Sequence, residues 1–322
     1  MRVARSLEEA AEFGPTAVTI GNFDGVHIGH RRLMEEAAAV GHAQDVVAGV
    51  LTFDPHPATI VAPQRAGKLL STQSERCSII AREGMDFVLI LPFTKLISMW
   101  TPQKFIEKVL VESLHAKLVV VGENFHFGHN QAGNTKVLTE LGKKYGFETR
   151  VVPPVRHRGV MVSSSSIRKL VEAGNVSRAA RLLARPYALQ GEVVKGRGIG
   201  STQTVPTLNL NPGEAALPAT GVYITRTADM MEDNRHWKSI TNVGYRPTFA
   251  DGTGSELSVE TFLLDPFKPP TPTHIRVEFL RRVREERKFE TPEALKTQIL
   301  KDVSRALKFF ERIRTAAPAA LG

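Results

Sequence analysis

Thr19-Ile20-Gly21-Asn22-Phe23-Asp24-Gly25-Val26-His27-Ile28-Gly29-His30 is the stretch of sequence that decides the fold of the first half of the chain. Its first two residues end an apolar run, residues 17–20, that predicts a short buried strand. Its last residues begin a segment with helical periodicity. A strand, a glycine-containing turn and a helix in this order are typical of an α/β fold. The first turn of such a helix has free backbone N–H groups and a positive dipole end, so this junction favours an anionic ligand.

Two histidines at the junction are the first candidate site residues. His27 and His30 are three positions apart, so both imidazoles lie on one face of the first helical turn, and Gly29 between them leaves room for a ligand. The alternative is a pair of solvated histidines near a helix start. Imidazole donors beside exposed amides suit a phosphate group, so we predict a phosphate-binding loop. The loop before the histidines consists of Gly21, Asn22, Phe23, Asp24 and Gly25.

Strands and helices alternate through the rest of the first half. Apolar runs predict strands at residues 46–53, 87–91, 118–121 and 149–152, and helical patterns lie between them, at 75–84, 101–112 and 134–145. This alternation indicates a parallel sheet covered on both faces, and ligands bind beyond the carboxyl ends of such strands. Asp54, His56 and Asn124 follow predicted strands, so we expect them near the histidine loop.

The number of histidines in this half raises a metal site as an alternative. No Cys or acidic residue stands at a spacing typical of structural zinc, and histidines beside glycines suit phosphate better. The histidines concerned are His27, His30, His56, His126 and His129.

A serine-rich segment, residues 163–166, precedes Ile167, Arg168 and a further helical pattern. Serine hydroxyls cap helices, which is the simplest explanation. The alternative that we favour is a second anion site, in which the hydroxyls of Ser164 and Ser165 and the guanidinium of Arg168 hold a triphosphate.

The pattern changes to period two after Arg185-Pro186. Five or six strands separated by turns predict a small antiparallel barrel, with strands at 187–194, 222–227, 238–243, 257–264 and 275–280. A closing helix over residues 291–313 follows, capped by Thr291, and an apolar face is expected to pack on the barrel. That face consists of Leu295, Ile299, Val303, Leu307 and Phe310. We therefore expect domains at 1–185 and 186–314 and a flexible tail at 315–322.

Four motifs in order resemble the prokaryotic bifunctional riboflavin kinase/FAD synthetase family: G-N-F-D-G-V-H-I-G-H, T-F-D-P-H-P, V-G-E-N-F-H-F-G and S-S-S-S-I-R. The resemblance spans residues 15–312. It implies a Rossmann-like nucleotidyltransferase domain of the HxGH type and then a riboflavin kinase barrel with a C-terminal helix. It also implies that His27 and His30 stabilise the ATP phosphates and that Asn124 lines the nucleotide and flavin site. Ser164, Ser165 and Arg168 match the phosphate-binding positions of the family.

Motifs of the second half extend the resemblance. Pro206-Thr207-Leu208-Asn209 is similar to the P-T-A-N motif of riboflavin kinases, whose Thr and Asn hold the Mg²⁺ of Mg-ATP. The resemblance makes Glu260 the base for the ribityl hydroxyl; the alternative is a solvent-facing residue on an alternating strand. Thr204 and Val205 differ from the family pattern, and its D-L-Y-G turn is absent. Further nucleotide or flavin contacts are implied for Gly196, Gly198, Gly200, Asn242 and Arg284, although the glycine segment alone would be interpreted as a hairpin loop.

Composition limits the alternatives. The 322 residues carry a net charge of +9, spread along the chain and without the alternating basic and aromatic residues of nucleic-acid-binding strands, so we expect no nucleic-acid partner. A single cysteine, Cys77, no signal peptide and no membrane-spanning apolar run indicate a cytoplasmic protein that is not associated with a membrane. The sequence does not define an oligomeric state.

The expected function is flavin cofactor synthesis. The barrel would convert riboflavin and ATP to FMN and ADP with Mg²⁺, and the first domain would convert FMN and a second ATP to FAD and pyrophosphate. One alternative is an adenylyltransferase whose barrel only binds flavin or has a regulatory role. Another is a basic nucleic-acid-binding barrel attached to a degenerate nucleotidyltransferase.

Overall fold

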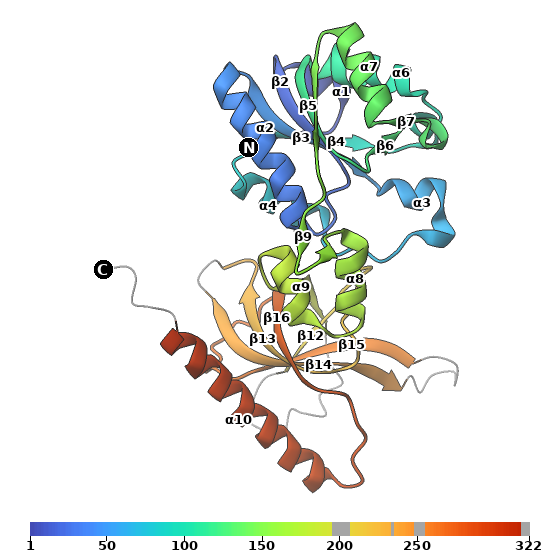
Figure 1. Cartoon of the computed structure of the whole chain (residues 1–322). Coiled ribbons are helices and arrows are strands. Elements are labelled where there is room, and N and C mark those ends of the chain that lie inside the picture. The colour runs from blue at the N-terminus through green and yellow to red at the C-terminus, as the bar shows by residue number, and fades with distance from the viewer. Residues whose placement is uncertain (195–206, 233–234, 248–254, 317–322) are drawn as a thin grey trace. The chain divides into compact units, whose positions relative to one another are not determined.

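The computed structural model describes residues 1–194, 207–232, 235–247 and 255–316, and the chain divides into two compact units, residues 1–164 and 165–322. The first unit is an α/β domain with a six-stranded, entirely parallel sheet in the order β1-β4-β3-β2-β5-β8 (Figure 1). The predicted α/β fold is therefore confirmed. The strands are β1 (Arg2–Ala4), β2 (Thr16–Ile20), β3 (Val47–Asp54), β4 (Phe87–Pro92), β5 (Ala116–Gly122) and β8 (Glu148–Val152).

The strand order reverses between β2 and β5. From β2 the chain adds β3 and β4 on one side, and it then crosses back to place β5 on the other side of β2. In doubly wound sheets ligands bind outside the carboxyl ends of the strands at such a reversal. The G-N-F-D-G loop follows β2 and the V-G-E-N-F segment spans the end of β5, so both motifs lie at the reversal.

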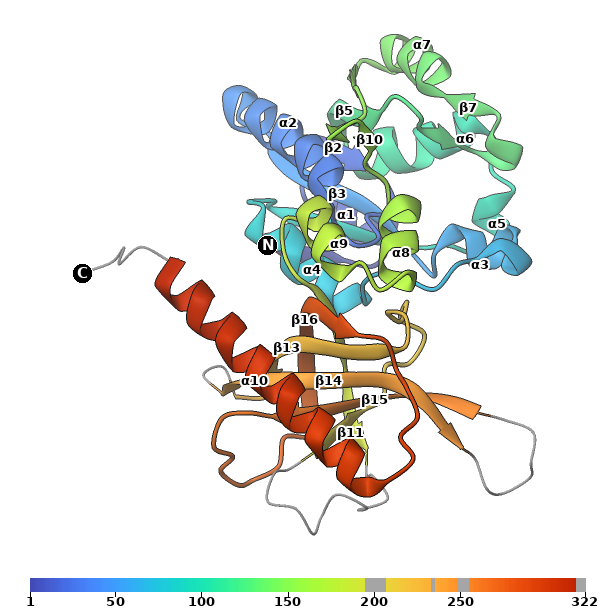
Figure 2. The ribbon, with the colours of Figure 1, turned by 60° about the horizontal axis from the view of Figure 1, so that its bottom comes forward.

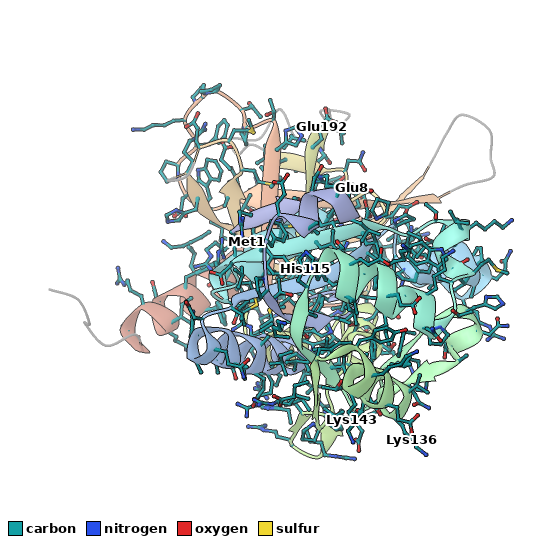
Figure 3. All side chains as sticks on the ribbon, turned by 90° about the horizontal axis from the view of Figure 1, so that it is seen from above. Met1, Glu8, His115, Lys136, Lys143 and Glu192 are labelled. Atoms are coloured by element: carbon teal, nitrogen blue, oxygen red, sulfur yellow. The ribbon has the colours of Figure 1, made fainter. Side chains whose placement is uncertain are left out.

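Helices cover both faces of this sheet (Figure 1). On one face α2 (Ile28–Gln44) packs against β2, β3 and β5, and α4 (Gln73–Arg82) packs against β4. On the other face lie α1 (Leu7–Ala11), α7 (Thr135–Tyr145) and the π-helical segment η2 (Ile106–Ser113). Side chains fill the space between these layers, while Lys136 and Lys143 of α7 are exposed (Figure 3). A cluster of buried apolar residues lies on each face, which accounts for the apolar runs of the central strands.

The segment after Thr101 differs from the prediction of one α-helix over 101–112. Thr101 caps the short helix α6 (Pro102–Phe105), with the Lys104 N–H donating to Thr101 Oγ1. The helix then changes to the wider π-helix η2, at whose end the Leu114 N–H donates to the Val109 carbonyl five residues back. Both helix types place Ile106, Val109 and Leu110 on the sheet, so the apolar pattern does not distinguish them.

Short elements complete the first unit at the carboxyl edge of the sheet and after β8. They are α3 (Pro57–Val61), η1 (Pro63–Arg65), α5 (Lys95–Ser98), β6 (His126–Phe127), η3 (His129–Gln131), β7 (Gly133–Asn134), β9 (Arg156–His157) and β10 (Val160–Met161).

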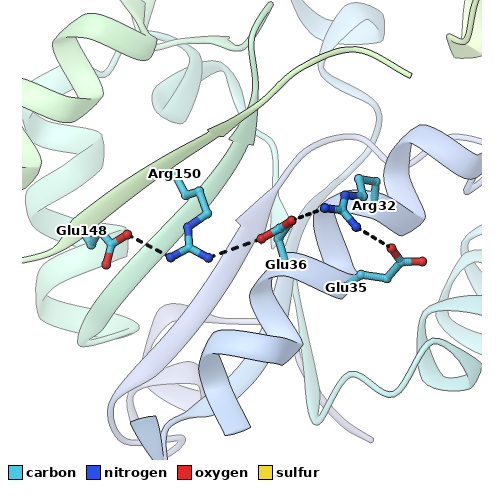
Figure 4. A network of polar contacts seen from close by, with 5 residues as sticks. All are labelled: Arg32, Glu35, Glu36, Glu148 and Arg150. Carbon is cyan, nitrogen blue, oxygen red and sulfur yellow. Dashed lines mark hydrogen bonds and ion pairs between the residues drawn. The ribbon is translucent and has the colours of Figure 1, made fainter. Parts of the chain in front are cut away.

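A chain of charged residues joins α2 to the edge strand β8 (Figure 4). Glu36 of α2 accepts from Arg150 of β8 at 3.3 Å and from Arg32 at 2.6 Å. Arg32 also contacts Glu35 at 3.4 Å, and Arg150 contacts Glu148 at 3.2 Å. The shared carboxylate of Glu36 therefore links the edge of the sheet to the helix that begins at the candidate site.

The second unit contains α8 (Ser164–Glu172, of which Ser164 belongs to the first unit), α9 (Val176–Leu183) and a closed antiparallel barrel in the order β11-β12-β15-β14-β13-β16 (Figure 2). The predicted barrel is confirmed, and its sixth strand, β12, holds the Thr207–Asn209 motif. The strands are β11 (Tyr187–Val194), β12 (Thr207–Leu210), β13 (Gly221–Asp229), β14 (His236–Pro247), β15 (Ser255–Leu263) and β16 (His274–Arg284).

A row of hydroxyl groups lies in the barrel interior. Thr241 Oγ1 lies 2.8 Å from Thr225 Oγ1 and 2.9 Å from Thr261 Oγ1. Ser239 Oγ lies 2.8 Å from the hydroxyls of both Thr225 and Thr227, and all five residues are fully buried. Buried hydroxyls are stable only when they are hydrogen-bonded, and these groups satisfy one another across β13, β14 and β15.

The helix α10 (Pro292–Ala316) lies across the outside of the barrel (Figure 2). Thr291 caps it as predicted, since its Oγ1 accepts from the Ala294 N–H at 3.1 Å. Ala306 and Phe310 pack on a buried cluster with Val222, Ile224 and Ile240. The helix ends at Ala316 rather than at 313, and residues 317–322 of the predicted tail lie outside the described residues.

The predicted apolar face of α10 is only partly correct. Val303 and Phe310 pack on the barrel, but Leu295, Ile299 and Leu307 are exposed. Two polar residues, Gln298 and Asp302, take buried positions instead. Asp302 accepts from Arg284 Nε at 2.8 Å and from Gln298 Nε2 at 2.8 Å. Asp302 can be buried because its carboxylate is paired. Since Asp302 and Gln298 take part of the buried face of the helix, some of the apolar residues point outward.

Candidate active sites

The loop between β2 and α2 has an unusual backbone. Phe23, Gly25 and Val26 have φ values of 50°, 78° and 35°. Positive φ is strained for a residue with a side chain and most of all for a β-branched residue such as Val26. Both Phe23 and Val26 are fully buried. Their packing and the hydrogen bonds described below hold this conformation.

The two histidines stack at the start of α2. Their ring centroids are 3.6 Å apart with planes inclined by 14°, and Phe23 meets the His30 ring edge-on at 5.0 Å. His27 is the N-cap residue, and its Nδ1 accepts from the His30 N–H at 3.2 Å. Because Nδ1 accepts this hydrogen bond, a proton on this ring is carried by Nε2. A Cβ on Gly29 would lie 3.1 Å from the His27 ring, so any larger residue here would crowd the imidazole.

Several of the predicted loop residues hold the loop in place through hydrogen bonds. Asp24 is buried, and its Oδ1 accepts from the N–H groups of Leu70 and Ser71 at 2.8 and 3.2 Å. Gly25 N–H donates to Ser71 Oγ at 2.9 Å, and the Asn22 carbonyl accepts from Thr52 Oγ1 at 3.2 Å. Asp24, Phe23 and the Asn22 carbonyl therefore hold the loop. Gly21, whose N–H donates to the Leu51 carbonyl, ties it to the end of β3.

Three further predicted residues lie at the same edge of the sheet. Asp54 is exposed at the end of β3, and His56 caps α3, with its Nδ1 accepting from the Ala58 N–H at 3.2 Å. Asn124 is exposed after β5. Since β3, β2 and β5 are neighbours in a parallel sheet, their carboxyl-terminal loops lie side by side.

The serine segment begins at this edge. Ser164 Oγ donates to the Asp24 carbonyl at 2.9 Å, which connects the motif to the histidine loop. Ser165 and Arg168 belong to the second unit, where Ser165 is exposed and Arg168 is half-buried on α8.

Apolar side chains exposed on α3, on α5 and just after α5 were not expected from the sequence. Val61, Leu96 and Met99 are 60%, 70% and 60% exposed, and α3 contacts α5. Large exposed apolar side chains close to one another indicate a surface that binds an apolar group. No periodic pattern in the sequence indicates this surface, because it is formed by short loops and helices.

The metal alternative finds no support among the described residues, which contain no group of three or more His, Cys, Asp and Glu side chains that could hold a metal ion. His126 and His129 instead direct Nδ1 toward the carbonyls of Asn124 and Ser98, at 3.0 and 3.2 Å.

The second candidate site is a row of side chains on the outside of the barrel. Asn209 of β12 is directly opposite Glu260 of β15, and Glu260 is directly opposite Asn242 of β14. Opposed residues in antiparallel strands point to the same face, and so do Thr207 and Asn209, two apart on one strand. Asn209 is buried, Glu260 and Asn242 are half-buried and Thr207 is exposed. The row can present two amide oxygens, one hydroxyl and a carboxylate to one ligand.

The other predicted residues of the second half have different positions. Arg284 forms the ion pair with Asp302 described above, and its Nη1 donates to the Glu285 carbonyl at 3.0 Å, so it holds α10 against β16. A Cβ on Gly244 would lie 2.2 Å from Glu286 Oε1 and 3.0 Å from Asn242 Nδ2, which brings the segment after Arg284 beside the row. Gly196, Gly198 and Gly200 lie outside the described residues.

Comparisons with known proteins cover both units. A family model for FAD synthetase matches residues 9–166, and one for riboflavin kinase matches residues 183–310. The chain is 33% identical over 310 residues to a bifunctional riboflavin kinase/FMN adenylyltransferase of Escherichia coli (strain K12), covering 96% of this chain and 97% of that protein. It is 33% identical over 311 residues to a protein of the same description from Pseudomonas fluorescens, covering 95% and 97%.

A solved structure shares the fold over nearly the whole chain. The crystal structure described as a macrolide-efflux protein from Streptococcus pneumoniae matches with a TM-score of 0.82 and 26% identity, covering 94% of this chain and 97% of that chain. Among the residues described for this protein, no helix is both long and apolar enough to cross a membrane.

Proposed function

The chain belongs to the bifunctional riboflavin kinase/FMN adenylyltransferase family, and we propose that His27, His30 and Glu260 carry out its two reactions. The enzyme converts riboflavin and ATP to FMN and ADP, and it converts FMN and ATP to FAD and pyrophosphate. The proposed domains are residues 1–185 for adenylyl transfer and residues 186–314 for phosphoryl transfer. A cytoplasmic location, which the single Cys77 favours, belongs to the same proposal.

Adenylyl transfer joins two charged groups. An oxygen of the FMN phosphate attacks the α-phosphorus of ATP, and the bond from that phosphorus to the α–β bridging oxygen breaks, so pyrophosphate leaves with the bonding electrons. The nucleophile is already ionised, so the step needs no strong base. Its barrier falls when donors align the phosphates and stabilise the charge that develops on the leaving group.

The histidine loop has the donors for this step. Since His27 Nδ1 caps α2, a proton on this imidazole would be donated from Nε2, and the Ile28 and Gly29 N–H groups belong to the first turn of the helix. We assign His27 and His30 to the ATP phosphates and Asp54, His56 and Asn124 to the rim of the nucleotide and flavin site. Ser164, whose Oγ donates to the Asp24 carbonyl, adds a phosphate contact in this proposal, and Ser165 and Arg168 on α8 are proposed as further phosphate ligands. The exposed Val61, Leu96 and Met99 would receive the flavin ring, whose faces are apolar.

Phosphoryl transfer needs a different set of groups. Glu260 would accept the proton of the ribityl 5′-hydroxyl while that oxygen attacks the γ-phosphorus of ATP, and ADP leaves with the electrons of the broken bond. Asn242, directly opposite, is placed to orient the carboxylate or the hydroxyl. The half-buried Glu260 is accessible to a substrate on the outer face of the barrel.

Thr207 and Asn209 fit a hard cation. Their hydroxyl and amide oxygens share a face with Glu260, and such oxygens suit Mg²⁺ with retained waters. When bound, Mg²⁺ neutralises charge on the β- and γ-phosphates. In this proposal Thr207 and Asn209 face the phosphates of ATP, and Glu260 faces the ribityl hydroxyl.

The observation that carries the proposal is the Asn209–Glu260–Asn242 row on a barrel separate from the histidine loop. Chromatography of products after incubation with riboflavin, ATP and magnesium tests it. FMN and FAD should both form, and a chelator should stop FMN formation. Formation of FAD from supplied FMN with none from riboflavin would instead favour a barrel that only binds flavin.

A further inference from the structure

Residues 70–76, which lie outside all the sequence motifs named above, form hydrogen bonds to the histidine loop. Leu70 and Ser71 donate backbone N–H groups to Asp24 Oδ1, and Ser71 Oγ accepts from the Gly25 N–H. Arg76, in the first turns of α4, donates from Nη1 to the Asn22 carbonyl at 2.8 Å. Four hydrogen bonds from this segment thus converge on loop residues 22–25, and Phe23 and Gly25 among them have positive φ.

Arg76 is an unusual residue for such a position. It is only 3% exposed, and its Nε has no hydrogen-bond partner. Among the residues that the structure describes, no carboxylate lies within ion-pairing distance of it. A guanidinium has five N–H donors, and burying its charge without a counter-charge opposes folding. A neutral donor would hold the Asn22 carbonyl without this penalty, so stability of the fold does not account for an arginine here.

The charge has a clear use if the loop binds a polyphosphate. Asn22 and His27 belong to the same loop, and a positive charge in a buried, low-dielectric position acts on anions beyond hydrogen-bonding distance. Arg76 would then raise the positive potential around the first turn of α2 while it fixes the backbone that carries the histidines.

We propose that Arg76 is a positioning residue for adenylyl transfer, which holds the strained histidine loop and supplies a buried positive charge toward the pyrophosphate portion of ATP. This inference rests on the proposed function of the His27 loop. It assigns no direct contact between Arg76 and the reacting atoms.

The test compares three variants of the full-length enzyme. Arg76→Gln removes the charge and keeps a donor, Arg76→Lys keeps the charge, and Arg82→Gln makes the same chemical change at an exposed position of the same helix. FAD formation from FMN and ATP, inhibition by inorganic pyrophosphate and thermal unfolding are measured for each. FMN formation from riboflavin is the control for the second unit.

Arg76→Gln should lower kcat/KM for ATP in FAD formation by about tenfold or more and weaken inhibition by pyrophosphate by a similar factor. Arg76→Lys should recover most of both losses, and Arg82→Gln should match the wild type. FMN formation should be unchanged throughout. A purely structural arginine would lower the unfolding temperature without changing pyrophosphate inhibition of the folded enzyme.

Two results would overturn the inference: Arg76→Gln that behaves as Arg82→Gln, or Arg76→Lys that loses as much pyrophosphate inhibition as Arg76→Gln.

If Arg76→Gln does not fold, Arg76→Lys and Ser71→Ala decide, since Ser71→Ala loosens the loop without removing charge and should lower kcat but keep pyrophosphate inhibition. His27→Asn separates this inference from the proposed function. An active His27→Asn enzyme would refute the proposed function, whereas an inactive one beside a normal Arg76→Gln refutes only the role of Arg76.

Discussion

Asn209 and Glu260 are directly opposite one another on β12 and β15, and their side chains share the outer face of the barrel. Neither residue depends on a loop for this relationship, because strand register alone sets it. The neighbouring strand β14 adds Asn242 on the other side of Glu260. The proposed proton acceptor and the proposed cation ligand are thereby held close together by strand register, which is the preorganisation that phosphoryl transfer requires.

The buried hydroxyl row behind this face should contribute to barrel stability. Thr241→Val keeps the shape of the side chain but leaves the Thr225 and Thr261 hydroxyls with one partner fewer. We expect the free energy of unfolding of the second unit to fall by about 1–3 kcal/mol. Thr241→Ser, which keeps the hydroxyl, should lose much less. Denaturant unfolding of both variants is the measurement, and equal losses would contradict the importance of the hydroxyl.

The ion pair between Arg284 and Asp302 should matter more than the surface pairs of the same barrel. Asp302→Asn leaves a largely buried guanidinium without its counter-charge, so we expect a loss of about 3 kcal/mol in the free energy of unfolding. Glu278→Gln, which weakens the pairs with the largely exposed Arg226 and with Arg276, should cost less than about 1 kcal/mol for each pair. Similar losses in the two variants would show that burial does not govern the difference.

Tyr223 should make the barrel sensitive to alkaline pH. Burial raises the pKa of Tyr223 to about 12, from 10 in the unfolded chain. The folded state therefore favours the protonated phenol, so this contribution to stability is intact below pH 10 and is lost as the pH rises toward 12. The loss should be on the order of 2 kcal/mol. Unfolding measured from pH 9 to 12 should show this decline, and Tyr223→Phe should remove most of it.

Gly29 should be required for adenylyl transfer alone. A Cβ at this position would lie 3.1 Å from His27 Cε1 and Nδ1, so Gly29→Ala must displace the imidazole by a few tenths of an ångström. We expect FAD formation to fall roughly tenfold, because small displacements of aligned groups slow phosphate chemistry strongly. FMN formation by the same protein should be unchanged. A parallel loss of both activities would point to general misfolding.

Much of the fold was predictable from the sequence because long, regular patterns encode it. The strands around the histidine loop, the change to period two after Pro186 and the cap of α10 all follow from apolar periodicity and capping residues. β1 was missed because it has only three residues, whose pairing with β4 depends on a distant part of the chain. The apolar face of α10 was partly wrong because Asp302, a charged residue, is buried by its pairing with Arg284.

Candidate site residues can be proposed from the sequence where they are close along the chain. The His27–His30 spacing and the Thr207–Asn209 spacing are local, and their motifs identify them. The roles of Asp24 and Phe23 in holding the loop were not predictable, because their partners, Leu70, Ser71 and the buried core, lie far along the chain. The burial of Arg76 is likewise a tertiary property that no sequence pattern reports.

We assign the two reactions to two separate sites, and product analysis of two variants tests this assignment most directly. His27→Asn with His30→Asn should convert riboflavin to FMN at the wild-type rate and make no FAD, and Asn retains a capping oxygen for α2. Glu260→Gln should make no FMN from riboflavin and should convert supplied FMN to FAD normally, whereas the exposed control Glu192→Gln should retain both activities. Loss of both activities in either active-site variant, with the protein folded, would contradict two separate sites.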